Sequence, residues 1–311
     1  MICFGPVPSR RLGKSLGINN IPSRKVCSYS CIYCQVGITK DIRTKQATFY
    51  KPNDIFVAVK KHLDLLNEKD KPDYLTFVSN GEPTLDIHLG ETIGMLKVFG
   101  LPIAVITNAS LLFNPNVRDA LYLADWVSVK VDSNDRTIWE WINRPDSNLD
   151  FECYRESIID FSAKYSGKLM TETMLISGVN DSQNALQQTA ELLYSIQPDI
   201  AYLSIPIRPP AVSSIKIPSE SAMIEAHQIL SEKNIQVELL LGFEGTNTGY
   251  TGNIIDDIVD ICTVHPIRED TMMELLRKDN ATPDILTSLI EQKYIKAIQY
   301  NLNTFYIRRF F

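Results

Sequence analysis

Short apolar runs alternate with longer amphipathic segments along most of the chain. The apolar runs have the length of strands and are bounded by turn residues. Because they carry few polar positions, we expect strands that are mostly buried, as in a parallel sheet. The predicted strands cover residues 15–19, 74–80, 103–108, 126–132, 169–176, 200–207 and 237–243.

The segments between these strands carry apolar residues at the spacing of amphipathic helices. Asn53 is a candidate N-cap for the first helix, and Asp181 and Ser182 stand immediately before the fifth. The predicted helices cover residues 54–67, 89–98, 116–123, 152–164, 182–195 and 220–233.

Strands that alternate with helices favour parallel pairing with right-handed crossovers. About six such units predict an α/β fold, a partial TIM-type (β/α)6 barrel over residues 1–245. An open doubly wound sheet is the competing arrangement. In both, the carboxyl ends of the strands form the site. Polar residues gather at those ends: Ser79 to Glu82, Thr107, Asn108, Lys130, Asp132, Ser177, Gly178 and Arg208.

The pattern changes after Gly245, where a turn-rich segment begins. We expect residues 246–265 to be a linker and residues 266–311 to be a small winged-helix-like module. Its predicted elements are a helix over 269–278, a second helix over 283–292 with Thr282 as N-cap and Pro283 in the first turn, and a two-stranded hairpin.

Composition limits the class of protein. Hydrophobic residues make up 44% of the chain and the net charge is −6, which indicates a folded protein without general affinity for nucleic acid. No apolar stretch is long enough to span a bilayer, and no secretory signal is present at the start, so we expect a soluble cytoplasmic protein.

The C-terminal module has too little positive charge for a DNA-reading winged helix. From Pro266 onward it carries 7 basic and 6 acidic residues, and its second helix has no basic residue. No sequence-specific DNA binding is expected, and we favour docking of a protein, peptide or other substrate. The only candidate basic patch consists of Lys293, Lys296, Arg308 and Arg309.

Three of the six cysteines lie within eight residues, with the spacing C-x3-C-x2-C: Cys27, Cys31 and Cys34. In a reducing compartment such a cluster points to metal or redox chemistry. Three thiolates can ligate three irons of a cubane and leave the fourth iron open, whereas electron-transfer clusters take four cysteines. A zinc site is the alternative, but structural zinc requires four ligands.

Three motifs in chain order resemble those of the radical S-adenosylmethionine (SAM) superfamily. The first is the cysteine motif, with Tyr33 before the last cysteine. Residues 79–83 look like the GGE motif, with Asn80 in place of its first glycine. Residues 174–181 are similar to the GxIxGxxE motif, with Met174 and Asp181 replacing Gly and Glu.

The resemblance implies a 4Fe–4S cluster and SAM as cofactors. It implies reductive cleavage of SAM to a 5′-deoxyadenosyl radical, which abstracts hydrogen from a substrate, with electrons from a low-potential flavodoxin or ferredoxin. By the same resemblance, the cluster ligands are Cys27, Cys31 and Cys34, and the SAM-binding positions are Tyr33 and Ile176 with Gly178 near the adenine, Asn80, Gly81 and Glu82 at the methionine amino group, and Lys130 and Asp132 near the ribose or carboxylate.

Each SAM-binding position also has a structural interpretation. Gly81 can make a strand-to-helix turn, with Glu82 as a solvated acid in the first turn. Gly178 and Asp181 can form a turn and a helix cap. Tyr33 can belong to the core, and Lys130 and Asp132 can be an ion pair within the barrel.

Several other polar or sulfur-containing residues have alternative roles. The basic stretch of Arg10, Arg11, Lys14, Arg24 and Lys25 can face phosphate or be solvated surface charge. Arg208 can bind a substrate carboxylate or phosphate, or hold its loop. We interpret His265 as structural, and Cys3, Cys153 and Cys262 as buried small hydrophobic residues.

A narrower group of radical enzymes, related to those of wybutosine synthesis on tRNA, is similar in residues 5–19, 79–85, 142–145, 172–181 and 264–266. The tRNA enzymes carry a second cluster with its own cysteines, which have no grouped counterpart here. This difference argues against the wybutosine reaction itself. We expect a radical SAM enzyme whose substrate is not identified by the sequence, with tRNA or another macromolecule as the leading candidate. The alternatives are a peptide or small-metabolite substrate, and a non-catalytic iron–sulfur redox or sensor protein.

Overall fold

The computed structural model describes residues 2–21 and 24–309. In this part of the chain the main sheet has eight strands, ordered β1-β2-β5-β6-β7-β8-β9-β10. Neighbouring strands are parallel except β1 and β2, which are antiparallel. The strands are β1 (Cys3–Ser9), β2 (Gly13–Ile18), β5 (Tyr74–Phe77), β6 (Ile103–Thr107), β7 (Trp126–Lys130), β8 (Lys168–Met174), β9 (Ile200–Ser204) and β10 (Val237–Leu240).

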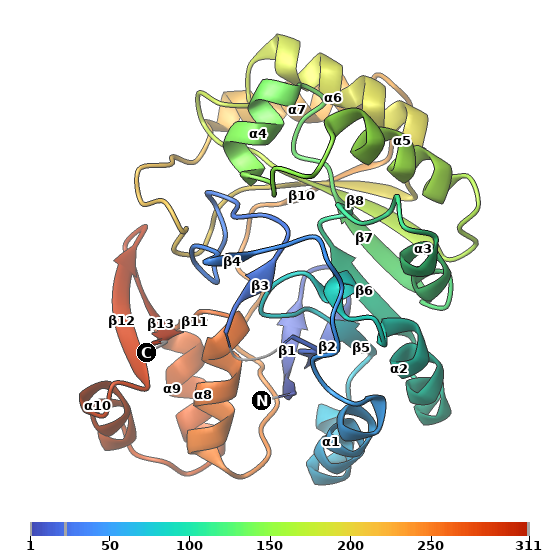
Figure 1. Ribbon diagram of the computed structural model, residues 1–311. Coiled ribbons are helices and arrows are strands. Elements are labelled where there is room, and N and C mark those ends of the chain that lie inside the picture. The colour runs from blue at the N-terminus through green and yellow to red at the C-terminus, as the bar shows by residue number, and fades with distance from the viewer. Residues whose placement is uncertain (1, 22–23, 310–311) are drawn as a thin grey trace.

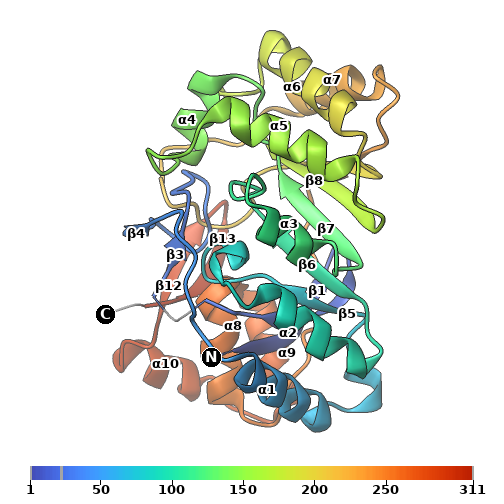
Figure 2. The ribbon, with the colours of Figure 1, turned by 45° about the vertical axis from the view of Figure 1, so that its right-hand side comes forward.

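The sheet curls into a half-barrel, as Figure 1 shows. A doubly wound sheet reverses its strand order at a switch point, whereas here each parallel strand lies beside the next one in the chain. Figure 2 shows the helices that follow these strands on the outer, convex side of the sheet. The predicted partial barrel is therefore confirmed over its doubly wound competitor.

The six predicted helices are all present, with ends shifted by at most two residues. Ser182 caps its helix, because its side chain accepts a hydrogen bond from the backbone of Ala185. Asn53 is not an N-cap, since its helix begins one residue earlier, after Lys51. These helices are α1 (Pro52–Leu65), α2 (Leu89–Leu96), α3 (Pro115–Leu121), α5 (Phe151–Ser162), α6 (Gln183–Ile196) and α7 (Glu220–Ser231).

Several elements were not predicted. Helix α4 (Arg136–Asn143) is capped by Asp135, which accepts from the Ile138 amide at 2.9 Å. Strand β1 was also missed, as were the two-stranded pair β3 (Val26–Cys27) and β4 (Asp41–Ile42). Short 3-10 helices complete this region: η1 (Glu68–Asp70), η2 (Pro83–Leu85) and η3 (Lys97–Phe99).

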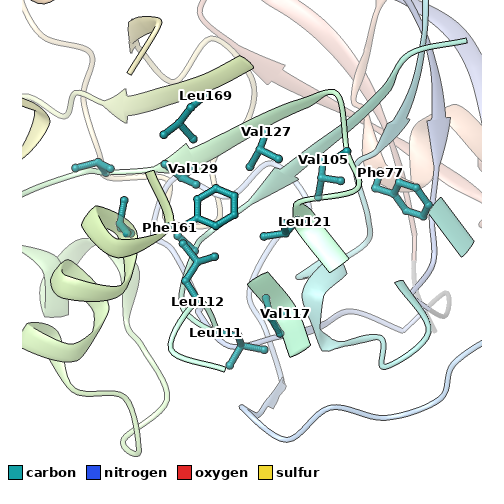
Figure 3. Packing of buried hydrophobic residues seen from close by; sticks show 14 of the residues in the cluster. Phe77, Val105, Leu111, Leu112, Val117, Leu121, Val127, Val129, Phe161 and Leu169 are labelled. Carbon is teal, nitrogen blue, oxygen red and sulfur yellow. The ribbon is translucent and has the colours of Figure 1, made fainter. Parts of the chain in front are cut away.

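The main core lies between the sheet and the outer helices (Figure 3). Val105, Val127 and Leu169 extend from three neighbouring strands toward Leu121 of α3 and Phe161 of α5. All five side chains are buried. Burial of an aliphatic or aromatic side chain contributes about 1.5–3 kcal/mol, so this layer fixes the curvature that positions the opposite, concave face.

The C-terminal region packs against β1 rather than standing apart (Figure 1). Phe4 and Val7 of β1 share one hydrophobic cluster with Ile258 and Ile261. The prediction of a linker over 246–265 is wrong for residues 254–264, which form helix α8. The region comprises α8 (Ile254–Val264), β11 (Ile267–Arg268), α9 (Glu269–Lys278), α10 (Asp284–Glu291), β12 (Ile295–Tyr300) and β13 (Asn303–Arg308).

The predicted order of helix, helix and hairpin is present in α9, α10 and the β12–β13 pair. Thr282 is not the N-cap of α10, because the helix begins at Asp284 and Pro283 precedes it without a side-chain cap. Strand β11 adds to the hairpin in the order β11-β13-β12. None of the helices described is long and apolar enough to cross a membrane.

Candidate functional site

The loop that carries Cys27, Cys31 and Cys34, here called the cysteine loop, begins at β3 and lies on the concave side of the half-barrel. Helix α4 contacts this loop. The Ile32 amide donates to the Ile142 carbonyl at 2.9 Å. Trp139 of α4 donates through its indole N–H to the hydroxyl of buried Tyr29 at 3.1 Å. The loop is thus held by a helix about one hundred residues further along the chain.

Each of the three loop cysteines has its own N–H donor. Two of these donors are buried asparagine amides and the third is a lysine ammonium, so the sulfur atoms lie in a polar, partly positive environment. Hydrogen bonds of this kind stabilise thiolates and orient metal ligands. The pairs are Asn108 Nδ2 to Cys27 Sγ at 3.6 Å, Asn143 Nδ2 to Cys31 Sγ at 3.5 Å, and Lys25 Nζ to Cys34 Sγ at 3.1 Å.

A single metal ion and an iron–sulfur cluster place different demands on three thiolates. Among the histidine, cysteine, aspartate and glutamate side chains that the structure describes, no three converge on a point where one ion could sit. A zinc site needs its ligands around one centre, whereas a cubane takes each thiolate on a separate iron. Burial raises the pKa of Cys27 to about 12, so cluster loading must release thiol protons.

Gly81 is required by the backbone of the cysteine loop. Its φ is +145°, and a Cβ at this position would lie 1.7 Å from the Val26 carbonyl oxygen. The Val26 amide donates to the Asn80 carbonyl at 3.3 Å, and the Glu82 amide donates to the Val26 carbonyl at 3.1 Å. The glycine therefore lets β3 lie directly on the chain that follows β5.

Glu82 is buried, with 2% of its surface exposed, so its interpretation as a solvated acid is wrong. Its carboxylate accepts from Thr84, from the Thr107 hydroxyl at 2.6 Å and from the Asn108 amide at 2.8 Å. Burial raises the pKa of Glu82 despite these donors. The carboxylate thus ties η2 to the end of β6, beside the asparagine that contacts Cys27.

Tyr33, which is partly exposed, and buried Asp132 form one hydrogen-bonded unit. The Tyr33 hydroxyl donates to Asp132 at 2.6 Å, and Asn143 donates to the same oxygen at 2.7 Å. The other Asp132 oxygen accepts from the Met174 amide at 2.9 Å. Burial raises the pKa of Asp132. This unit connects the cysteine loop with α4 and with the end of β8.

Lys130 does not pair with Asp132 as one interpretation expected. Its ammonium lies 2.6 Å from Glu172 and 5.5 Å from the centre of the Tyr33 ring. Glu172 also accepts from Arg11, across the concave face of the sheet. Although burial alone would raise it, Arg11 and Lys130 hold the pKa of Glu172 well below its ordinary value.

The segment after β8 forms a tight turn. The Gly178 amide donates to Asp181 at 2.8 Å, and the φ of Gly178 is +72°. The amide of buried Ile176 donates to the Asn180 side chain at 2.8 Å. The turn interpretation of Gly178 and Asp181 is therefore confirmed, and the contact of Ile176 and Gly178 with adenine stays a prediction.

A cavity of about 270 Å³ opens on the concave face next to the cysteine loop. Every strand of the main sheet contributes at least one lining residue. Cys34, Tyr33 and the Lys130–Glu172 pair are among the lining residues. Many barrels fill this interior with branched aliphatic side chains, whereas here the lining combines apolar side chains with six charged ones. This is the expected position of a binding site.

Arg208 joins the cavity wall to the C-terminal region. Its guanidinium donates to Gln35 at 2.9 Å, pairs with Glu244 and lies 3.1 Å from His265 Nε2. Gln35 also donates to the carbonyl of Val264, at the end of α8. His265, expected to be structural, is the C-cap of α8 and also lines the cavity.

The predicted basic stretch is divided between two environments. Arg10 and Arg11 line the cavity, and Lys25 contacts Cys34. Lys14 instead contacts the carbonyl of Lys69, outside the cavity.

The remaining cysteines are not part of the site. Cys3 and Cys262 are buried, as predicted, whereas Cys153 is exposed on α5, so its interpretation as a buried hydrophobic residue is wrong.

Sequence reasoning did not identify several residues that the structure brings to the site. The sulfur contacts of Asn108 and Asn143 were missed, although Asn108 ends a strand and Asn143 lies in a segment noted for its similarity. Glu172 and Glu244 were also missed. No local signal marks these two, because their partners lie far away in the sequence.

Comparisons with known proteins place the chain in a family. Residues 21–192 match the radical SAM superfamily. A UPF0026 protein of Methanocaldococcus jannaschii is 44% identical over 310 residues, which covers 99% of this chain and 96% of that protein.

Solved structures share the fold. A radical SAM methyltransferase from Sphaerobacter thermophilus has a TM-score of 0.55 at 14% identity, covering 73% of this chain and 66% of that one. TYW1 with a lysine–pyruvate adduct bound has a TM-score of 0.53 at 19% identity, covering 71% and 75%. The half-barrel, the three-cysteine loop and these matches together identify the chain as a member of the radical S-adenosylmethionine superfamily.

Proposed function

We propose that Cys27, Cys31 and Cys34 hold the 4Fe–4S cluster that this superfamily uses, at the mouth of the half-barrel cavity, and that a substrate loses hydrogen inside this cavity. The observation that carries the proposal is the set of three cysteines at the spacing C-x3-C-x2-C, each with its own N–H donor. When bound, the cluster supplies the electron that reductively cleaves SAM.

SAM would bind beside this loop, along the carboxyl ends of β5, β7 and β8. Hydrogen bonds support this placement. Glu82 holds Asn108, which contacts Cys27, and Asp132 holds Asn143, which contacts Cys31. Two proposed SAM-binding positions, Glu82 and Asp132, are therefore each linked to a proposed cluster ligand by one asparagine side chain. The other proposed positions are Tyr33, Asn80, Gly81, Lys130, Ile176 and Gly178.

The roles of the chain's own residues are orientation and exclusion of water. Tyr33 is held between Asp132 and the Lys130 ammonium, so its ring has a fixed position at the cavity edge. Val264 and His265 close the cavity on the side of the C-terminal region. A closed wall protects a reactive intermediate from solvent, which a radical reaction requires.

The proposed substrate is a macromolecule, such as tRNA or a protein, whose reacting group enters the cavity. The C-terminal region, interpreted as winged-helix-like, would dock its body, and a low-potential flavodoxin or ferredoxin would deliver electrons. Lys293 and Lys296 are both exposed at the hairpin and belong to the predicted basic patch of this region. A small metabolite that needs no docking is the second candidate, and the cavity volume supports it.

The decisive experiment is anaerobic reconstitution followed by reduction in the presence of SAM. We expect about four irons per chain and formation of 5′-deoxyadenosine and methionine without added substrate. An intact cluster that does not cleave SAM under strong reductant would contradict the proposal and favour a redox or sensor protein. Zinc in place of iron would contradict the cluster assignment itself.

Docking by the C-terminal region needs a separate test. Deleting residues 266–311 would expose the hydrophobic side chains that Ile258 and Ile261 share with β1, and this could unfold the protein. Point substitutions are therefore preferable. The double variant Lys293→Glu with Lys296→Glu should lose turnover of a macromolecular substrate but keep cleavage of SAM alone. Unchanged turnover would favour the small-metabolite candidate.

A further inference from the structure

The cavity next to Cys34 is lined by more cations than anions. Its charged lining residues are Arg10, Arg11, Lys130 and Arg208 on the positive side, and Glu172 and Glu244 on the negative side. The lining thus has two more positive than negative charges. The whole chain carries a net charge of −6, so this excess is local to the cavity.

Each carboxylate of the cavity is shared by two cations. Glu172 pairs with Arg11 and Lys130, and Ser204 donates to it at 3.0 Å. Glu244 pairs with Arg208 and, at 3.6 Å, with Arg10. Both glutamate side chains are at most 8% exposed. One carboxylate cannot neutralise two guanidinium groups in a site with limited access to water.

The shortage of negative charge is largest around Arg10 and Arg208. The Arg10 Nη1 atom is buried and has no hydrogen-bond acceptor among the residues that the structure describes. Burial lowers the pKa of both arginines. Burial, followed by the charges of Arg208 and Arg10, lowers the pKa of His265 well below its ordinary value. The imidazole is therefore neutral and does not add a third positive charge.

We propose that Arg10 and Arg208 bind an anionic group of the substrate, a phosphate or a carboxylate, inside the half-barrel cavity. This inference rests on the proposed function, because it assigns a substrate class to the same cavity. Guanidinium groups recognise both anions through paired N–H donors. Glu244 Oε2 is also buried and has no donor among the described residues, so it can accept from a hydroxyl or amine beside that anionic group.

The cofactors also bring negative charge close to this cavity. SAM itself carries a carboxylate, and a cluster bound by three thiolates is negatively charged. Lys25 contacts a thiol sulfur directly, at 3.1 Å from Cys34. Arg10 and Arg208 instead contact Glu244, and Arg208 also contacts Gln35. A substrate anion would bind in addition to SAM. If the excess positive charge served only SAM or the cluster, no further anion would bind once both were in place.

The test uses anaerobically reconstituted protein saturated with SAM. Inorganic phosphate and malonate are titrated separately by calorimetry at constant ionic strength, with chloride as the reference anion. We expect one saturable site for at least one probe. Arg10→Gln should raise its dissociation constant about tenfold or more, the loss of one charge-assisted hydrogen bond. Arg208→Lys, which keeps the charge but not the planar donor pair, should weaken binding less.

Arg136→Gln is the matched control, because Arg136 forms an exposed ion pair with Asp150 on the outer side. It should leave phosphate and malonate binding unchanged. No saturable binding, competition between the probe and SAM, or an unchanged dissociation constant in Arg10→Gln would each overturn the inference. Cleavage of SAM by the wild-type preparation is measured in parallel. Cleavage without anion binding refutes only this inference, whereas anion binding without cleavage refutes only the proposed function.

Discussion

The cysteine loop and the charged cavity adjoin each other but are built in different ways. The loop is fixed by backbone hydrogen bonds and by neutral amides, at contacts such as Ile32 with Ile142 and Asn108 with Cys27. The cavity is fixed by ion pairs between distant segments, such as Arg11 with Glu172. Both regions depend on contacts between distant segments, but a short cysteine motif marks the loop in the sequence, whereas no local motif marks the ion pairs of the cavity.

The largest expected effect separates ligands from other cysteines. Cys34→Ala should abolish both the absorbance of the cluster and the cleavage of SAM, because a cubane with two protein thiolates is not retained. Cys153→Ala is the control, since Cys153 is exposed on α5, away from the loop. Iron content and visible absorbance after reconstitution measure the effect. Equal loss in both variants would mean that the ligands are assigned wrongly.

A second substitution tests the close backbone contact between Gly81 and Val26, which positions the cysteine loop. Gly81→Ala would place a Cβ 1.7 Å from the Val26 carbonyl at a φ of +145°. We expect the free energy of unfolding to fall by about 3 kcal/mol or more, the combined cost of strain and displaced packing. Urea denaturation measures it. Gly94→Ala, at an exposed helical position with open space, should stabilise by about 0.5–1 kcal/mol. Similar values for both would refute the close-contact explanation.

The cavity is tested by removing one shared charge. Glu172→Gln leaves Arg11 and Lys130 without their carboxylate, and should destabilise the protein by about 3 kcal/mol at neutral pH. Glu152→Gln, at an exposed pair with Arg155, should change stability by less than about 0.5 kcal/mol. Urea denaturation at pH 7 compares the two. A small effect of Glu172→Gln would mean that the ion pairs do not hold the cavity together.

The same variant has a predicted pH dependence. The pKa of Glu172 is lowered in the folded protein, so its ionised form favours folding above the pKa of the unfolded chain, about 4.3. This contribution decreases as the pH falls below that value. The difference in stability between wild type and Glu172→Gln should therefore be constant from pH 7 to 5 and shrink toward pH 3. A difference that grows on acidification would refute the assignment.

The smallest expected effect is a change in the reduction potential of the cluster, without loss of the cluster itself. Lys25→Met removes the ammonium from Cys34 and should lower the reduction potential of the cluster, because a positive donor favours the more negative, reduced state. A shift on the order of 60 mV corresponds to a tenfold change in a one-electron equilibrium. Potentiometric titration followed by EPR measures it. Lys40→Met, exposed on the same loop, should leave the potential unchanged.

The sequence predicted the half-barrel because periodicity is a local property. Each apolar run became a strand, and strands in parallel order can only be joined in a few ways. The roles of the glycines were predicted less well. Gly81 was expected to admit a ligand or make a turn, but the atom that requires it is the Val26 carbonyl, more than fifty residues earlier.

The charged residues of the cavity could not be paired from the sequence. Lys130 was expected to pair with Asp132, but β7 ends at Lys130, so Asp132 lies beyond the strand. Lys130 instead pairs with Glu172, the residue opposite it on the neighbouring strand β8. Residues 246–265 were expected to be a linker because their first half is turn-rich. Helix α8 forms there because its apolar face is covered by β1.

The junction formed by Gln35, Arg208 and Val264 has a consequence for how such an enzyme diversifies. The Gln35 side chain connects the cysteine loop with the last turn of α8. Replacing the C-terminal region with another domain would therefore remove Val264 and His265 from the lining of the cavity. We therefore expect substrate specificity to change through substitutions elsewhere in the C-terminal region, while the contacts of Gln35 and Arg208 with Val264 and His265 are kept.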